Sequence, residues 1–110
     1  MSIFIKVATD YTKTPGGRHK KEGDFSGEDF RESILLPKYR EALEKGCELI
    51  IDLDGGYGYA PSFLEEAFGG LARELKDDRI IRTINIISEE EPKLVDDINN
   101  YIADALGKKK

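Results

Sequence analysis

The fold of this chain is decided by the stretch LIIDLDGGYGYAPSFLEEAFGG, residues 49–70. Its beginning, Leu49 to Leu53, is a mostly apolar run with two isoleucines, which predicts a central strand buried on both faces. Glycines then end the strand, because glycine adopts backbone angles that other residues avoid. Pro61 restricts Ala60 to extended geometry, so Ser62 falls where the N-cap of a helix is expected. The stretch predicts a strand, a glycine-rich loop and a helix entered through a serine.

Length and composition are those of one ordinary domain. Of 110 residues, 39% are hydrophobic and 35% charged, so we expect a single domain over 1–110. The apolar run Ile3 to Ala8 is too short for a signal peptide or a membrane span, and we expect a cytoplasmic protein. The net charge of −5 argues against generic nucleic-acid binding, which needs a basic footprint. A lone Cys47 is interpreted as a small buried hydrophobe.

Strand and helix patterns alternate along the rest of the chain. Ile3 to Ala8 alternates as a strand with one well-buried face does, and Ile80 to Ile87 is a third β-rich run. Apolar residues recur at helical spacing from Ser62 to about Leu75, and Pro92 opens a final helix.

Another long helix is predicted to begin at Ser26. Ser26 and Asp29 form an S-x-x-D start signal. Pro37 should kink this helix or restart it, because proline removes a backbone donor and disfavours helical geometry at Leu36. Strands that alternate with helices require crossover connections. We therefore predict an α/β fold with a largely parallel or mixed sheet and helices packed against it.

The predicted helix start at Ser62 has two interpretations. With Glu65 it has the spacing of a capping box, which gives the hydroxyl a structural use. The same hydroxyl, at the positive end of a helix, is also a candidate phosphate acceptor. Gly69 and Gly70 lie inside this helix at a cost of about 1 kcal/mol each relative to alanine. They indicate close approach of another backbone or a partner, or close packing on the sheet.

Basic residues cluster in the segment before Ser26. This segment is either a solvated loop or a site for an acidic or phosphorylated partner. Residues 16–22 form either a short edge strand or a mobile loop. The tail lysines, residues 108–110, are expected to complement the negative end of the last helix. The basic residues are Lys13, Arg18, His19, Lys20 and Lys21, of which the last four are the candidate anion-binding residues.

The sequence offers little evidence of a catalytic site. The glycine loop lacks the G-K-[ST] ending of a P-loop and the G-x-G-x-x-G spacing of a dinucleotide fold. His19 is the only histidine. We therefore predict no catalytic residue, no metal site and no cofactor. The alternative is a nucleotide- or anion-binding protein, or an enzyme, that uses Asp52, Asp54 and the basic loop 18–21.

Three stretches of the chain carry a family resemblance: GDFSGEDFR at 23–31, LIIDLD at 49–54 and SFLEEAFGGL at 62–71. They resemble the STAS-like family of small prokaryotic domains, relatives of the sulfate transporter and anti-sigma factor antagonist domains. The resemblance covers most of the chain and implies a STAS-like α/β fold.

The same resemblance implies a regulatory role. In anti-sigma factor antagonists, a D-S-[ST]-G loop follows the buried strand, and a GHKL-type ATPase kinase phosphorylates its serine or threonine to switch partner binding. Ser62 is the matching position, which makes it the candidate phosphoacceptor. Ala60 stands in place of the aspartate, Pro61 replaces the first serine, and Phe63 replaces the glycine.

Our leading hypothesis is a non-enzymatic regulatory domain that docks a protein partner, such as a GHKL-type ATPase. The tyrosines of the glycine loop either supply amphipathic contact area or pack over the sheet end. A homodimer paired through the edge strand near Ile3 is a third hypothesis. The expected partner-binding residues are Gly55, Gly56, Tyr57, Gly58, Tyr59, Phe63 and Glu66.

Overall fold

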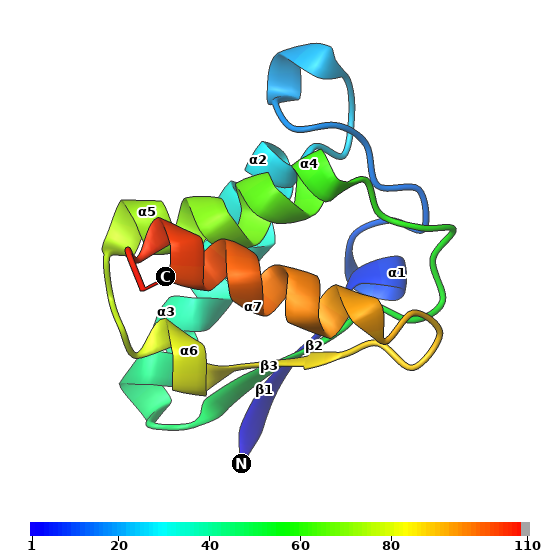
Figure 1. The fold of residues 1–110 in the computed structure, drawn as a ribbon. Coiled ribbons are helices and arrows are strands. Elements are labelled where there is room, and N and C mark those ends of the chain that lie inside the picture. Colours follow the sequence, from blue (N-terminus) through cyan, green and yellow to red (C-terminus); the bar gives the residue numbers. More distant parts are fainter. Residues whose placement is uncertain (109–110) are drawn as a thin grey trace.

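A computed structural model describes residues 1–108, so the tail positions 109–110 lie outside the described residues (Figure 1). No helix in the described part of the chain is long and apolar enough to cross a bilayer. The elements are β1 (Ser2–Lys6), α1 (Val7–Asp10), the 3-10 turn η1 (Lys20–Glu22), α2 (Gly27–Phe30), the π-helical turn η2 (Arg31–Leu35), α3 (Leu36–Lys45), β2 (Glu48–Asp52), α4 (Pro61–Leu64), the π-helical turn η3 (Glu65–Gly69), α5 (Gly70–Leu75), α6 (Ile80–Thr83), β3 (Ile84–Ile87) and α7 (Lys93–Ala105).

The three strands form a parallel sheet in the order β1–β2–β3, which confirms the predicted α/β fold and the central place of β2. A hydrophobic core lies between this sheet and the helices, and includes Ile5, Leu49 and Ile51 from the strands. Cys47, predicted to be a buried hydrophobe, is half-buried against that core. Because the strands are parallel, the loops that follow them all start at the carboxyl ends of the strands. Ligands and partners commonly meet α/β folds at these ends.

Only one face of the sheet is covered by helices, which corrects the prediction that the central strand is buried on both faces. Leu49 and Ile51 are fully buried, whereas Ile50 between them is half-buried. Exposed Phe4 and Asn85 flank Ile50 on the neighbouring strands. In Figure 1 the helices lie together on one side of the strands. An apolar run alone does not tell whether the second face of its sheet is covered.

The first long helix runs without a break through α2, η2 and α3. The Ser26 hydroxyl accepts the amide of Asp29 at 3.0 Å, which confirms the predicted cap. Leu36 keeps helical backbone angles, contrary to the expected effect of Pro37, but a new α-helical segment, α3, does start there with the proline in its first turn. The Leu36 amide donates to the carbonyl of Arg31, five residues back. This wider turn accommodates Pro37, which has no amide to donate and lies on the exposed side of the helix.

The helix after β2 begins earlier than predicted. Ala60 is extended, as predicted, but it is itself the N-cap residue, and Pro61 is the first helical residue. Proline suits that position because its fixed φ matches the helix and its missing amide would have no partner there. Ser62 lies inside the first turn, so its predicted N-cap role is wrong. The capping box is also absent, because the Glu65 carboxylate binds two arginines instead.

Two segments lack strands that the sequence allowed. Residues 16–22, predicted to form either an edge strand or a mobile loop, contain the turn η1 and no strand. The first half of the run 80–87 is the helical turn α6, in which the carbonyl of Asp77 accepts the amide of Ile80 at 3.1 Å. The last helix starts directly after Pro92, close to its predicted position.

Candidate functional site

The loop between β2 and α4, residues 53–60, is anchored to the rest of the molecule. Two of its glycines have φ angles of 93° and 127°, which confirms the predicted need for glycine in this turn. The Tyr57 amide donates to the carbonyl of Lys13 at 2.9 Å. The Tyr59 hydroxyl donates to the carbonyl of Leu53 at 3.0 Å. The loop is therefore tied both to the N-terminal segment and to its own start.

The two aspartates at the end of β2 are engaged in the fold. The Asp52 carboxylate accepts hydrogen bonds from Lys6 Nζ at 3.1 Å and from the Asp54 amide at 2.9 Å. The Asp54 carboxylate accepts the amides of Glu89 and Glu90, at 3.1 and 2.9 Å, and so joins the loop to the turn before α7. No group of three or more His, Cys, Asp or Glu side chains in the described part of the chain is placed to hold a metal ion.

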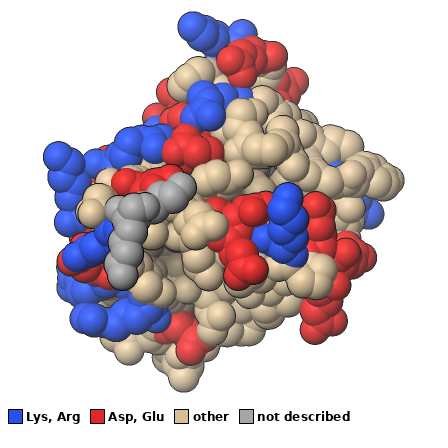
Figure 2. All heavy atoms as spheres, in the orientation of Figure 1, with Lys and Arg blue, Asp and Glu red and all other residues tan. Residues whose placement is uncertain are grey.

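A pocket of about 140 Å³ lies between the loop and the turn before α7. Asp54, Glu90 and Glu91 line it together with the loop tyrosines. Figure 2 shows carboxylate side chains over this turn and the start of α7, beside the uncharged surface of the loop. The Gly55 amide, a donor that an anion would need, already donates to Glu90 at 2.9 Å. The charge of the lining disfavours an anionic ligand in this pocket.

The predicted contact residues divide between surface and core. Tyr57 is 82% exposed. Tyr59 is half-buried with its ring 6.0 Å from that of Phe63, and burial raises the pKa of the Tyr59 hydroxyl above its usual range. Phe63 lies in the core and Glu66 is buried beside Arg31, so the expectation that these two face a partner does not match their placement. Gly55, Tyr57 and Gly58 are exposed, whereas Gly56 and Tyr59 are half-buried.

Ser62, the candidate phosphoacceptor, is half-buried at the second position of the helix. Its hydroxyl makes no hydrogen bond to any residue that the structure describes. The Glu65 amide donates to the carbonyls of both Pro61 and Ser62. The hydroxyl therefore has no structural role of the kind that the sequence predicts for it.

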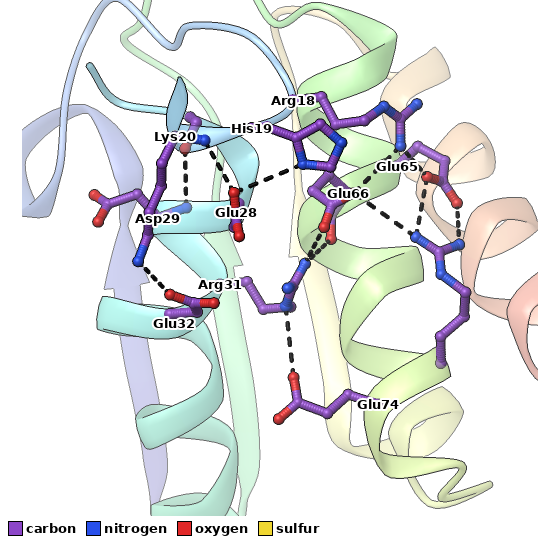
Figure 3. Close-up of polar contacts among 12 residues, drawn as sticks. Arg18, His19, Lys20, Glu28, Asp29, Arg31, Glu32, Glu65, Glu66 and Glu74 are labelled. Atoms are coloured by element: carbon purple, nitrogen blue, oxygen red, sulfur yellow. Dashed lines mark hydrogen bonds and ion pairs between the residues drawn. The ribbon is translucent and has the colours of Figure 1, made fainter. Parts of the chain in front are cut away.

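Three of the four candidate anion-binding residues bind carboxylates of the chain itself (Figure 3). An anion at this site would have to displace these carboxylates. Lys21, the fourth, is exposed on η1. The pairs are Arg18 with Glu65 at 2.6 Å, His19 with Glu28 at 3.6 Å, and Lys20 with Glu32.

The same segment caps the first long helix. The carbonyls of Gly17 and Arg18 accept the amides of Gly27 and Glu28, at 2.9 and 3.0 Å. These amides belong to the first turn of α2 and have no partner within the helix. The basic segment thus has a structural use in addition to its ion pairs.

A buried ion pair joins the first long helix to the helix α4–η3–α5, and the sequence did not predict it. Arg31 Nη1 lies 2.5 Å from the carboxylate of Glu66 and donates to its carbonyl at 2.8 Å. Both side chains are 12% exposed. The buried Arg31 Nε has no hydrogen bond to a described residue and lies 3.6 Å from Glu74. A Cβ atom at Gly70 would overlap the Arg31 guanidinium, so this glycine makes room for the arginine.

Glu65 extends this polar cluster to the surface. Its carboxylate lies 2.5 Å from Arg73 and 2.6 Å from Arg18. The hydrogen bond from Arg73 holds the pKa of Glu65 below its usual value, and the bond from Arg18 adds to that effect. Glu65 and Glu66 both lie in η3, so this π-helical turn presents its carboxylates to the arginines around it. The double glycine predicted close approach of a backbone, a partner or the sheet, whereas the structure places the Arg31 side chain against Gly70.

The comparison with protein families agrees with this architecture. The model of the STAS-like domain of unknown function (DUF4325) matches residues 26–94, which run from the cap of α2 into α7. No curated protein and no solved structure shows a significant match to the chain. Because the family model covers more than half of the chain, the chain belongs to the STAS-like domain family of unknown function.

Proposed function

We propose that this chain is a non-enzymatic regulatory domain that docks a protein partner through a docking surface formed by residues 55–59. The observation that carries the proposal is the 82% exposure of Tyr57 on an anchored loop. Tyrosine offers a large amphipathic contact area and loses little conformational entropy on binding. The docking surface leaves out Phe63 and Glu66, which the core takes up.

Charge around the docking surface favours a basic or neutral partner face. Asp54, Glu90 and Glu91 line the pocket beside Tyr57. Charges at the rim of an interface steer association and select against partners of like charge. Family resemblance suggests a GHKL-type ATPase as the class of partner.

Phosphorylation of Ser62 is the second part of the proposal. Its support is the hydroxyl that lacks a hydrogen bond to any described residue, in the first turn of a helix whose positive end favours an anion. Arg18 contacts Glu65 at 2.6 Å on the next turn and so offers a cation near the modified residue. A phosphate there would change the charge next to the docking surface.

Co-purification from cells that express the full chain tests the docking surface. Tyr57→Ala should lower recovery of the partner about tenfold, because truncating a central aromatic contact removes a large share of binding energy. Ile81→Ala is the matched control, since Ile81 is 54% exposed but lies on α6. Equal recovery with the two variants would overturn the docking surface.

Intact mass spectrometry tests the modification. After incubation with ATP and the recovered partner, the wild-type chain should gain the mass of one phosphate, and Ser62→Ala should not. Ser33→Ala, at an exposed serine of η2, is the control and should still gain it. No mass gain, or a gain that survives Ser62→Ala, rejects phosphorylation of Ser62 and leaves the test of the docking surface unaffected.

A further inference from the structure

β1 is an edge strand with no other strand of the described chain beside it on its outer side. Phe4 lies at its centre and is 61% exposed on the uncovered face of the sheet. An edge strand presents free backbone donors and acceptors, to which another extended chain can pair. A parallel sheet with one open face is also unusual, because such sheets are normally covered on both faces.

The hydrogen bonds around β1 show which backbone groups are free. The Lys6 amide donates to the Asp10 carboxylate at 2.8 Å, so it points away from β2. Backbone groups of successive residues point to opposite sides of a strand, so those of Ser2 and Phe4 also point to the outer edge. Backbone groups alternate in the same way along β2. The Leu53 amide, which directly follows β2, donates to the carbonyl of Ile87 in β3. The amide and carbonyl of Phe4 are thus directed outward at the centre of β1.

Charge on this edge is low, although the whole chain is acidic. A net charge of −5 makes two copies repel each other over most of their surface. The only charged side chain of β1 is Lys6, whose ammonium lies 3.1 Å from Asp52. β1 is therefore an edge at which two like-charged copies can approach, whereas a basic partner would favour the acidic surroundings of the docking surface.

We infer that a second copy of this chain pairs with β1 in antiparallel orientation about a two-fold axis at Phe4. Each Phe4 amide then donates to the Phe4 carbonyl of the other copy. The two phenyl rings lie next to each other on the uncovered face, where cross-strand aromatic pairs are stabilising. The ladder ends at Lys6 because Asp10 already holds that amide. Such a short interface gives a weak dimer that forms at high protein concentration.

Sedimentation equilibrium of the full chain tests the dimer. The wild type should self-associate between about 10 μM and about 1 mM, the range for a small interface. Phe4→Lys should weaken self-association at least about tenfold, because it places two ammonium groups at the axis. Ile81→Lys introduces the same charge at a position that is 54% exposed on α6 and should leave self-association unaltered. A monomeric wild type, or equal association of the two variants, overturns the inference.

Disulfide cross-linking tests the register with a smaller change. In a Cys47→Ala background, Phe4→Cys places two cysteines whose Cα atoms are about 5.5 Å apart in a hydrogen-bonded pair, within disulfide range. Mild oxidation should give a covalent dimer. Asn85→Cys, exposed on β3 at the same level of the sheet, is the control and should stay monomeric. Equal cross-linking at both positions would reject the two-fold axis at Phe4. Neither experiment depends on the docking surface.

Discussion

Ser26 and Ser62 stand in similar sequence settings but have different structural roles. The Ser26 hydroxyl caps the first long helix through the Asp29 amide at 3.0 Å. The Ser62 hydroxyl caps nothing. Ser26→Ala should therefore lower the free energy of unfolding by about 1 kcal/mol. Ser62→Ala should change it little, and urea denaturation compares the two. A larger loss in Ser62→Ala than in Ser26→Ala would contradict the assignment of the caps.

Arg31 makes the buried ion pair between the first long helix and the helix α4–η3–α5. Arg31→Met should lower the free energy of unfolding by about 3 kcal/mol, because it leaves the Glu66 carboxylate buried without its main partner. The double variant Arg31→Met with Glu66→Leu should lose less, since neither charge is then left in the interior. Urea denaturation of both measures this coupling. Equal losses in the single and double variants would show that the pair is not coupled.

At the scale of elements, the helix α4–η3–α5 needs Gly70 so that Arg31 can pass close to its backbone. Alanine at this position favours the helix by about 1 kcal/mol but drives a Cβ atom into the guanidinium. Gly70→Ala should therefore be destabilising in the wild type and stabilising in an Arg31→Ala background. Thermal unfolding measures the change in stability that Gly70→Ala causes in each of the two backgrounds.

Gly69→Ala is the matched control for this prediction. Its Cβ would lie 2.6 Å from Glu65 Oε2, the end of a more exposed side chain that can move aside. The cost should be smaller than for Gly70→Ala. If Gly70→Ala changed stability in the same direction in both backgrounds, the arginine would not be the reason for the glycine.

Local patterns predict elements well where one periodicity dominates. The strand at Leu49 to Leu53 and the helix after Pro92 are both present near their predicted positions. The run 80–87 looks uniformly β-rich, yet its first half is helical because the chain turns at Asp77 before the strand begins. Pro37 was expected to disturb a helix that a π-helical turn keeps continuous. Such adjustments depend on tertiary packing, which a local window does not contain.

The site was predictable only in part for a related reason. The glycine loop places Tyr57 at the surface, but helical periodicity did not show that Glu66 is buried. Its partner Arg31 lies on another helix, 35 positions away in sequence. Nothing in either local pattern pairs these two residues. The double glycine predicted a close approach, but not that the side chain of Arg31 makes it.

At the scale of the whole molecule, ion pairs make stability depend on pH. The hydrogen bond from Arg73 holds the pKa of Glu65 below its ordinary value of 4.5, and the hydrogen bond from Arg79 holds the pKa of Asp77 below its ordinary value of 3.8. In the acid range the unfolded chain therefore binds more protons than the folded chain. The free energy of unfolding should stay level above about pH 5 and fall as pH drops through the carboxyl range.

Urea midpoints measured from neutral to acid pH test this dependence. Glu65→Gln should give a flatter curve than the wild type, because it removes one of the groups that takes up a proton on unfolding. Glu44→Gln, at an exposed glutamate for which the structure gives no ion pair, is the control and should keep the wild-type slope. Stability that rises on acidification would contradict the assignment of these ion pairs.

At the scale of the whole molecule, the two proposals use separate surfaces that the described elements leave uncovered. One is the docking surface at the end of β2, with Tyr57 at its tip and carboxylates at its side. The other is the free edge of β1 around Phe4. A small domain with a sheet covered on one face thus has room for a partner and for a second copy at the same time.

Site-specific photo-cross-linking tests the docking surface most directly. A photoreactive phenylalanine derivative replaces Tyr57 in one full-length variant and Ile81 in the other, and both are irradiated in the cells that express them. The proposed function predicts a covalent adduct with one protein partner from position 57 and none from position 81. No adduct at position 57, or the same adducts from both positions, would contradict it.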